Sequence, residues 1–338
     1  MDRQTDLLCS SFKSCDAETK SLCADGLAHC GENPGAGQDP RRTILYRGSL
    51  KSCNYQCSYC PFSKHRISKR ELKDDREQWF RFCESLRESA KDLSIRALMV
   101  VPYGEALIHP WYWEGLGVLT KWDVLEAAGA QTNLSFSAER SLEIFDQFGG
   151  VREKLRLWAS FHPEMTACEE FAAKCIRLRE EGILLCAGAV GVPGNIDLLR
   201  RLRETLPDEI YLWINKMDGL KRPYTEEEIR VFQSIDPYFD RELRHVPADE
   251  RLCLNRLFVE ADGNVRRCNI SGASDKNWYE VNRKELFGES FLCRRKWCSC
   301  YLAYGLRDEE MNRALFGPDP LFRIPRRPGG WSTSTALH

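Results

Sequence analysis

The chain has 338 residues, of which 43% are hydrophobic and 29% charged, a composition typical of a globular protein with about two domains or one large α/β barrel. The 49 basic and 50 acidic residues give a net charge of −1, which argues against a nucleic-acid coat or a membrane-surface binder because either needs a net basic field. No apolar run approaches the roughly 18 residues of a membrane helix and the start lacks a signal-peptide core, so we expect a cytoplasmic protein without membrane or nucleic-acid partners.

The first 42 residues form a polar stretch without periodicity. The segment GENPGAGQDP (31–40) is rich in turn-forming residues, and we predict that residues 1–42 are a poorly ordered extension. Four cysteines lie in it at spacings that match no ligand loop known to us, namely Cys9, Cys15, Cys23 and Cys30.

From residue 43 to about 238, strand-like and helix-like segments alternate. Strands are predicted at 43–49, 95–104, 126–135, 155–164, 183–194 and 209–218, and helices at 68–89, 138–148, 168–182, 196–206 and 225–235. About six β/α repeats imply a parallel sheet, so the predicted fold is a partial (β/α)6 TIM-like barrel. Functional residues should then lie at the carboxyl ends of the strands.

The alternation stops near residue 239. A hairpin signal at 257–268 lies in a cysteine-rich part of the chain, and we predict a small metal-held domain over 239–316, followed by a tail at 317–338. Four further cysteines sit within regular periodicity and are expected to be buried structural thiols: Cys83, Cys168, Cys175 and Cys186.

The 16 cysteines indicate metal rather than disulfides in a reducing compartment. After the first strand, SLKSCNYQCSYCPFSK contains Cys53, Cys57 and Cys60 with the spacing Cys-x3-Cys-x2-Cys. Three thiolates are one too few to saturate either a zinc ion or a four-iron cluster, so one position stays open. A zinc knuckle or three unrelated buried cysteines are the alternatives.

This spacing, with an aromatic residue before the last cysteine, resembles the radical S-adenosylmethionine (radical SAM) superfamily. The resemblance covers most of residues 44–316 and implies that Cys53, Cys57 and Cys60 hold a 4Fe-4S cluster whose open iron binds the methionine part of S-adenosylmethionine (SAM). It places Tyr59 near the adenine, and it implies a flavodoxin- or ferredoxin-type reductant.

The resemblance extends to the turn after the second predicted strand, where Gly104 and Glu105 correspond to the family's Gly-Gly-Glu-like turn that holds the methionine ammonium. Tyr103 replaces one glycine. At other strand ends it implies further cofactor contacts from Asn133, Ser160, His162, Val190 and Gly191, and Gln131, Asn215 and Lys216 are polar groups within possible reach of cofactor or substrate. His162 could equally be a core histidine.

Five cysteines occupy the C-terminal part. Cys253 and Cys268 flank Gly263 as Cys-x9-Gly-x4-Cys, and Cys293, Cys298 and Cys300 follow as Cys-x4-Cys-x-Cys. The first pattern resembles the auxiliary-cluster hairpin of SPASM and twitch members of the superfamily. It implies one auxiliary 4Fe-4S cluster, with Cys293 and Cys300 competing for the fourth ligand position. A structural zinc is the alternative, because spacing alone does not separate the two.

The family's chemistry implies a 5′-deoxyadenosyl radical that removes hydrogen from a small-molecule substrate. By subfamily analogy we expect a lyase (decarboxylase) or oxidoreductase acting on a sugar acid or nucleoside in antibiotic-type biosynthesis, for example a cytosylglucuronic acid-like nucleoside. Lys216, Arg266 and Arg267 are candidate partners for its anionic group. Radical modification of a peptide is the alternative within the family, and a zinc-stabilised binding protein is the alternative of another class.

Overall fold

The computed structural model describes residues 41–60, 62, 65–244, 246–247, 255–270, 272, 274–280, 282–288, 297–298 and 310–329. Within these residues the chain builds one eight-stranded sheet in the order β6-β5-β4-β3-β2-β1-β8-β9. The first six strands are β1 (Arg42–Gly48), β2 (Ile95–Val100), β3 (Ala127–Thr132), β4 (Leu155–Phe161), β5 (Leu184–Gly191) and β6 (Leu212–Lys216). They follow one another in sequence order and pair in parallel, which confirms the predicted partial TIM-like barrel.

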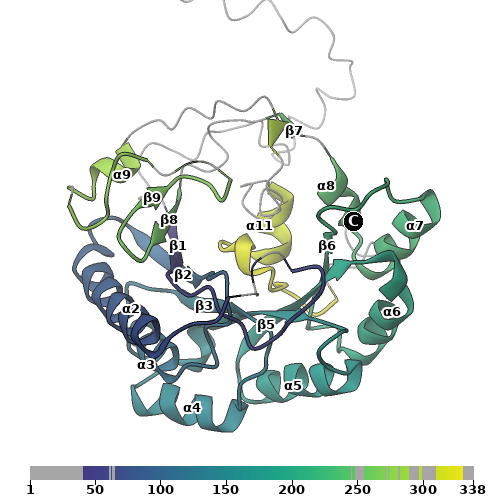
Figure 1. Cartoon of the computed structure of the whole chain (residues 1–338), viewed down its shortest axis with the longest axis horizontal. Helices are drawn as coiled ribbons and strands as arrows, with labels where there is room; N and C mark the ends of the chain where they lie inside the picture. The colour runs from purple at the N-terminus through teal and green to yellow at the C-terminus, as the bar shows by residue number, and fades with distance from the viewer. Residues whose placement is uncertain are drawn as a thin grey trace, which may run out of the picture. The chain divides into compact units, whose positions relative to one another are not determined.

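Helices follow the strands and cover the outer face of the curved sheet, as Figure 1 shows. They are α2 (Lys69–Ser89), α3 (Pro110–Thr120), α4 (Ala138–Gln147), α5 (Cys168–Glu180), α6 (Ile196–Thr205), α7 (Glu226–Ile235) and the short α8 (Phe239–Leu243). Capping boxes start two of them, with Ser68 and Glu71 at α2 and Thr225 and Glu228 at α7. Of the described helices, none is both long and apolar enough to cross a bilayer.

Helix α3 was not predicted, because its sequence PWYWEGLGVLT is apolar on all sides and contains two glycines. The structure explains both glycines by close packing between α2 and α4. A Cβ on Gly115 would lie 2.2 Å from the Trp79 indole nitrogen, and one on Gly117 would lie 2.7 Å from the carbonyl oxygen of Phe145. The helix therefore exists because it is buried between its neighbours rather than because of an amphipathic pattern.

Strand β8 (Arg256–Glu260) pairs in parallel with β1, and β9 (Val265–Arg266) pairs antiparallel with β8. The hairpin predicted at 257–268 is therefore confirmed, and it extends the barrel sheet beyond β1. The other described strands and α-helices are β7 (Val246–Pro247), which pairs with β10 (Trp297–Cys298), and the short helices α9 (Glu285–Gly288) and α11 (Glu310–Phe316).

The concave face of the sheet carries its own hydrophobic core. Inward-facing side chains of the strands, such as Leu45, Met99 and Trp158, pack there against Phe316, Leu321 and Phe322 from α11 and the following 3-10 helix Pro320–Phe322. Figure 1 shows α11 inside the curve of the sheet. Leu321, Phe322 and Ile324, which lie within the predicted tail at 317–338, thus pack inside the barrel.

Candidate active site

A cavity of about 160 Å³ opens at the carboxyl ends of strands β1 to β4. Two loops and two strand ends supply most of its walls: the cysteine loop after β1, the turn after β2, and the ends of β3 and β4. The sequence-predicted residues that line it are Cys53, Cys57, Cys60, Gly104, Glu105, Gln131, Asn133, Ser160 and His162. The fold therefore brings residues from four separate segments to one cavity, at the barrel end where active sites are built.

Main-chain hydrogen bonds fasten the cysteine loop to the turn after β2. The amide of Gly104 donates to the carbonyl oxygen of Leu50 at 3.1 Å, and the amide of Glu105 donates to that of Ser52 at 3.0 Å. A Cβ on Gly104 would lie 1.9 Å from the Ser52 carbonyl oxygen, so only glycine allows this approach. The glycine thereby places the Glu105 carboxyl beside the start of the loop that carries Cys53.

The other side of the cysteine loop is fastened to the end of β4. Glu164 accepts hydrogen bonds from the Ser58 amide at 2.6 Å and from the Ser58 hydroxyl at 2.5 Å. The Tyr59 hydroxyl lies 3.0 Å from Nδ1 of His162, and the two rings stack with centroids 6.1 Å apart. Tyr59 therefore does not line the cavity itself but orients His162, which does.

The three thiols line the cavity. Burial, followed by the nearby Cys60 thiol, raises the pKa of Cys57 to about 11, and burial also raises the pKa of Cys53. Two N–H groups point at the sulfur of Cys53, the Tyr55 amide at 3.4 Å and Nδ2 of Asn133 at 3.7 Å. Such donors are the hydrogen bonds by which proteins stabilise cluster-bound thiolates.

The three thiols come from one loop and border one cavity. A zinc ion needs all its sulfur ligands at about 2.3 Å, whereas a four-iron cluster binds each thiolate through a different iron. Three thiols on one loop leave one coordination position open in either case, and a three-thiolate iron–sulfur cluster is one group that they could hold.

Glu105 is a buried carboxylate, only 3% exposed. Its Oε1 accepts from the Leu107 amide at 3.0 Å and the Thr132 hydroxyl at 2.8 Å, and its Oε2 accepts from the Asn133 amide at 2.6 Å. Burial nevertheless raises its pKa to about 7, and no ion pair to it occurs among the described residues. A hydrogen-bonded acid held at a cavity wall without a counter-ion is suited to receive a cationic group of a ligand.

His162 is held neutral. Burial lowers its pKa to about 4, although Glu164 opposes the shift. Its ring is fixed between Tyr59 and Tyr55, whose ring centroid lies 5.9 Å away in an edge-on arrangement. A neutral, fixed imidazole at the cavity wall can exchange hydrogen bonds with a ligand without carrying charge.

Besides Tyr59, four residues predicted at strand ends lie outside the lining of this cavity. Val190, Gly191, Asn215 and Lys216 stand at the ends of β5 and β6, and the carbonyl oxygen of Gly191 accepts a hydrogen bond from the Tyr224 hydroxyl at 2.8 Å. Of the five C-terminal cysteines, Cys268 and Cys298 are half-buried, whereas Cys253, Cys293 and Cys300 lie outside the described residues. The auxiliary cluster therefore stays a prediction.

Several lining residues were not predicted from the sequence: Arg47, Tyr55, Phe62, Pro102, Tyr103 and Thr132. Phe62, 44% exposed, packs against Tyr103 with ring centroids 4.8 Å apart. A polar residue at a strand end was the available signal for Thr132. Arg47 gave none, because its strand reads as an ordinary buried segment.

No protein-family model and no curated protein matches the chain in sequence. Among solved structures, the chain is similar to BtrN in complex with AdoMet and 2-DOIA, with 16% identity and a TM-score of 0.36 over 74% of this chain and 82% of BtrN. It is also similar to anSMEcpe with bound AdoMet and the Cp18Cys peptide, with 14% identity and a TM-score of 0.44 over 86% of this chain and 89% of the other. These similarities are too low to transfer function, so the function is argued from the site.

Proposed function

We propose that the protein is a radical SAM enzyme. One observation carries the proposal: the thiols of Cys53, Cys57 and Cys60 border the same cavity as the buried Glu105, at the carboxyl end of a parallel partial barrel. A three-thiolate cluster and a carboxylate without a counter-ion are complementary to a ligand that chelates iron and carries an ammonium group. The methionine part of SAM has both properties.

A cluster held there would supply one-electron reduction of SAM, the chemistry that permits hydrogen abstraction from an unactivated carbon. The chain's own residues position these reactants. Cys53, Cys57 and Cys60 would hold the cluster, and the N–H groups of Tyr55 and Asn133 would stabilise the Cys53 thiolate.

Further side chains would hold SAM. Glu105, fixed by the Thr132 hydroxyl and the Asn133 amide, would accept the methionine ammonium. His162 and Ser160 from the end of β4 would contact the ribose or the carboxylate, and the backbone of Val190 and Gly191 would follow the adenine. Because these groups are fixed before SAM binds, little ordering cost remains at the reactive step.

For the substrate, we propose a sugar acid or a nucleoside that undergoes decarboxylation or dehydrogenation. The cavity is lined by Phe62, Tyr103 and Tyr55 together with polar groups, which suits a ligand with both C–H faces and hydroxyls. A dehydrogenation needs an acceptor for a second electron, which an auxiliary cluster at Cys268 and Cys298 would provide. A decarboxylation would not need that acceptor.

The test is anaerobic reconstitution with iron and sulfide, followed by metal analysis and a dithionite assay for 5′-deoxyadenosine. We expect roughly eight irons per chain if both clusters form and roughly four if only the radical cluster does, with 5′-deoxyadenosine in either case. A protein that takes up zinc, no iron and forms no 5′-deoxyadenosine would refute the proposal and favour a binding protein.

A further inference from the structure

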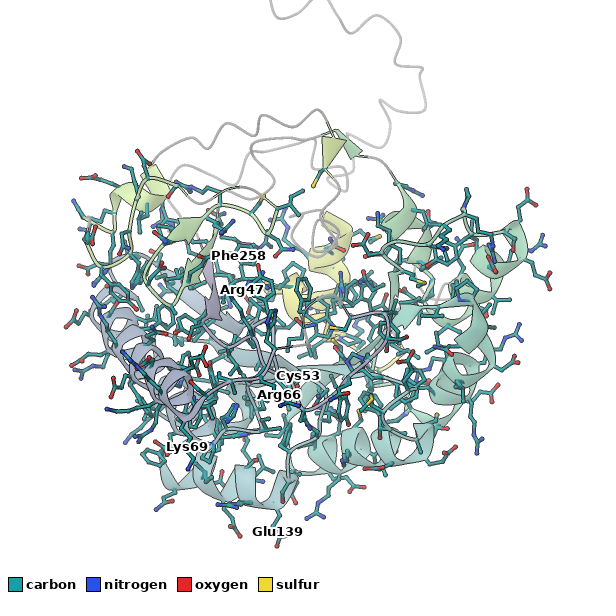
Figure 2. All side chains as sticks on the ribbon, in the orientation of Figure 1. Arg47, Cys53, Arg66, Lys69, Glu139 and Phe258 are labelled. Atoms are coloured by element: carbon teal, nitrogen blue, oxygen red, sulfur yellow. The ribbon has the colours of Figure 1, made fainter. Side chains whose placement is uncertain are left out.

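The segment that carries the three thiols has little backbone structure of its own. No helix or strand spans residues 53–60, and the one main-chain hydrogen bond made within them runs from the amide of Cys60 to the carbonyl oxygen of Cys57 at 3.2 Å. Figure 2 shows Cys53, the first residue of this segment, inside the curve of the sheet. The thiols are therefore kept in place by contacts with other parts of the chain.

One such contact reaches the loop between the second and the third cysteine. Glu164, three residues beyond the end of β4, accepts two hydrogen bonds from Ser58, the amide at 2.6 Å on Oε2 and the hydroxyl at 2.5 Å on Oε1. Each carboxylate oxygen thus takes one donor of the same residue, and hydrogen bonds to an ionised acceptor are short and strong. These bonds, the one from the hydroxyl foremost, lower the pKa of Glu164, so the carboxylate is ionised at neutral pH.

A second contact runs beside the first. The Tyr59 hydroxyl lies 3.0 Å from Nδ1 of His162, so two consecutive residues of the loop bind two residues that follow β4. Pro163 stands between His162 and Glu164, and its ring restricts the backbone there. The two partners of the loop therefore keep a fixed spacing, and one of them, His162, is itself a wall of the cavity.

The contact between Ser58 and Glu164 belongs to no hydrophobic core. Both residues are exposed, so their contact contributes little to the stability of the whole chain. It lies, however, directly next to Cys57, which is only 2% exposed, and two residues before Cys60. A contact that joins a loop to a strand end without supporting the core acts on the local opening of that loop.

We propose that Glu164 is a positioning residue of the radical site, which holds the thiols of Cys57 and Cys60 at the cavity by binding Ser58 to the end of β4. The inference rests on the proposed function for the group that the thiols receive, but not for the contact itself. Because the loop is fastened before any ligand arrives, these two thiols need not be ordered when a cluster binds, and less binding free energy is lost.

The contact is tested first in the iron-free protein, by hydrogen exchange of the peptides that cover residues 53–60. Glu164→Ala should speed exchange at Ser58 at least about fivefold, because it removes the acceptor of that amide. Ser58→Ala keeps the amide bond and should have a smaller effect. Glu139→Ala removes an exposed acid at the outer edge of α4 (Figure 2) and should leave exchange in these peptides unchanged.

The second measurement follows the release of iron from the reconstituted protein to a chelator, without SAM or reductant and so without turnover. Glu164→Ala should release iron at least about fivefold faster than the wild type, and Glu164→Gln, which keeps one carbonyl acceptor, should lie between them. The double variant Ser58→Ala/Glu164→Ala should be no faster than Glu164→Ala, since the two residues act through one contact. Glu139→Ala should match the wild type, and the urea midpoints of all the iron-free variants should be unchanged.

Four outcomes overturn the inference: exchange at 53–60 that is unchanged in Glu164→Ala, iron release that is unchanged although exchange has accelerated, an equal effect in Glu139→Ala, or a urea midpoint that falls in parallel with iron retention. The last would mean a general loss of stability rather than positioning. A wild type that takes up no iron, but whose exchange depends on Glu164, would instead refute the proposed function and leave the contact that fastens the loop standing.

Discussion

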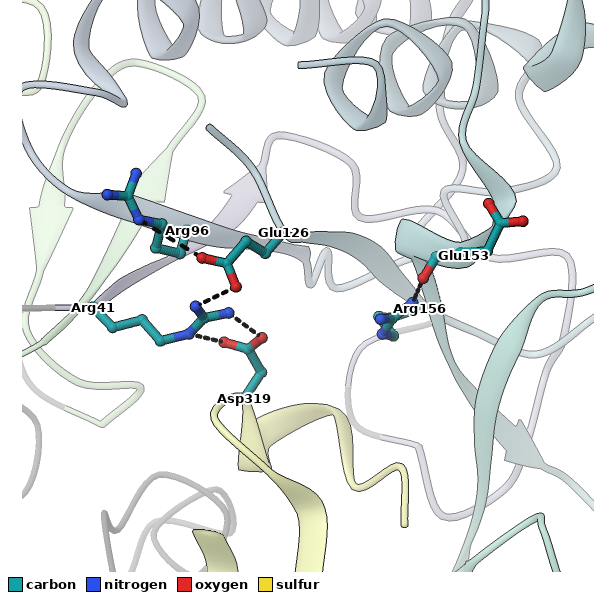
Figure 3. Close-up of polar contacts among 6 residues, drawn as sticks. All are labelled: Arg41, Arg96, Glu126, Glu153, Arg156 and Asp319. Carbon is teal, nitrogen blue, oxygen red and sulfur yellow. Dashed lines mark hydrogen bonds and ion pairs between the residues drawn. The ribbon is translucent and has the colours of Figure 1, made fainter. Parts of the chain in front are cut away.

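The two ends of the barrel differ in whether their charged side chains form ion pairs. At the amino ends of the strands, Arg41 binds Glu126 at 2.6 Å and Asp319 at 2.7 Å, and Arg96 lies 3.8 Å from the same Glu126 (Figure 3). At the carboxyl ends, Glu105 is buried without an ion pair among the described residues, and the nearby thiols have raised pKa values.

This difference in ion pairing indicates that one end of the sheet contributes to stability and the other end to ligand binding. Charges that are paired lower the energy of the folded chain, whereas a buried carboxylate without a cation raises it unless a ligand supplies the missing charge. The amino end therefore behaves as a closed structural end, and the carboxyl end behaves as a site whose partners come from outside the chain.

The largest effect is expected when a thiol is removed from the carboxyl end of the barrel. Cys57→Ala should lower the rate of 5′-deoxyadenosine formation at least about 1,000-fold, because a cluster held by two thiolates loses its fixed position. The measurement is 5′-deoxyadenosine per chain after reconstitution, together with the iron content. Cys175→Ala, which removes a buried thiol from α5, is the matched control and should keep both. Full activity in the Cys57 variant would contradict the proposed function.

A second test addresses the inside of the barrel between the two ends. Phe322, 2% exposed, packs in the concave core, so Phe322→Ala should lower the free energy of unfolding by about 4 kcal/mol through the cavity it leaves. Urea denaturation measures the change. Leu198→Ala, at a side chain 39% exposed, should change it by less than about 0.5 kcal/mol. Similar small losses in both variants would show that residues 317–329 do not stabilise the barrel.

The buried Glu105 carboxyl should make the free energy of unfolding depend on pH. The pKa of Glu105 is raised to about 7 by burial, so the folded chain binds a proton that the unfolded chain has already lost. This group's contribution is therefore fully present below about pH 4.5 and is lost as the pH rises toward about 7, a decline of about 3 kcal/mol.

Glu105→Gln should lack that decline in stability. The free energy of unfolding of the variant minus that of the wild type should therefore increase as the pH rises. The measurement is urea denaturation of the iron-free proteins across this range. His162, whose pKa is lowered to about 4 by burial, acts with the opposite sign, but it is present in both proteins and cancels in the difference. A difference that does not change with pH would mean that Glu105 titrates normally.

Most of the barrel could be predicted from the sequence because its strands are apolar runs between helices of amphipathic pattern. α3 could not, since its burial between α2 and α4 removes the periodicity on which prediction depends. Nor could the place of Phe322, because nothing local in the segment after α11 indicates that it turns back into the barrel. Both failures come from contacts between segments distant in sequence.

The site residues also divide into those with a local sequence signal and those placed by distant segments. The spacing of Cys53, Cys57 and Cys60 is local, so the sequence alone defines it, and the structure places all three around one cavity. The position of Arg47 at the cavity depends on a bulge against β8, more than 200 residues further along the chain, and on rings from the turn after β2 and from β8. A residue placed by such distant partners carries no signal in its own neighbourhood.

The smallest expected effect lies at the amino end. Asp319→Asn removes one half of a partly exposed ion pair with Arg41, whose side chains are 15% and 25% exposed, and should lower the free energy of unfolding by about 1 kcal/mol. The loss should shrink at high salt, because salt screens the pair in the wild type. Iron content and 5′-deoxyadenosine formation should be unchanged, since neither Arg41 nor Asp319 lines the cavity with the three thiols. A variant that folds but loses 5′-deoxyadenosine would show that the two ends are coupled through the core and that their separation into structure and function is wrong.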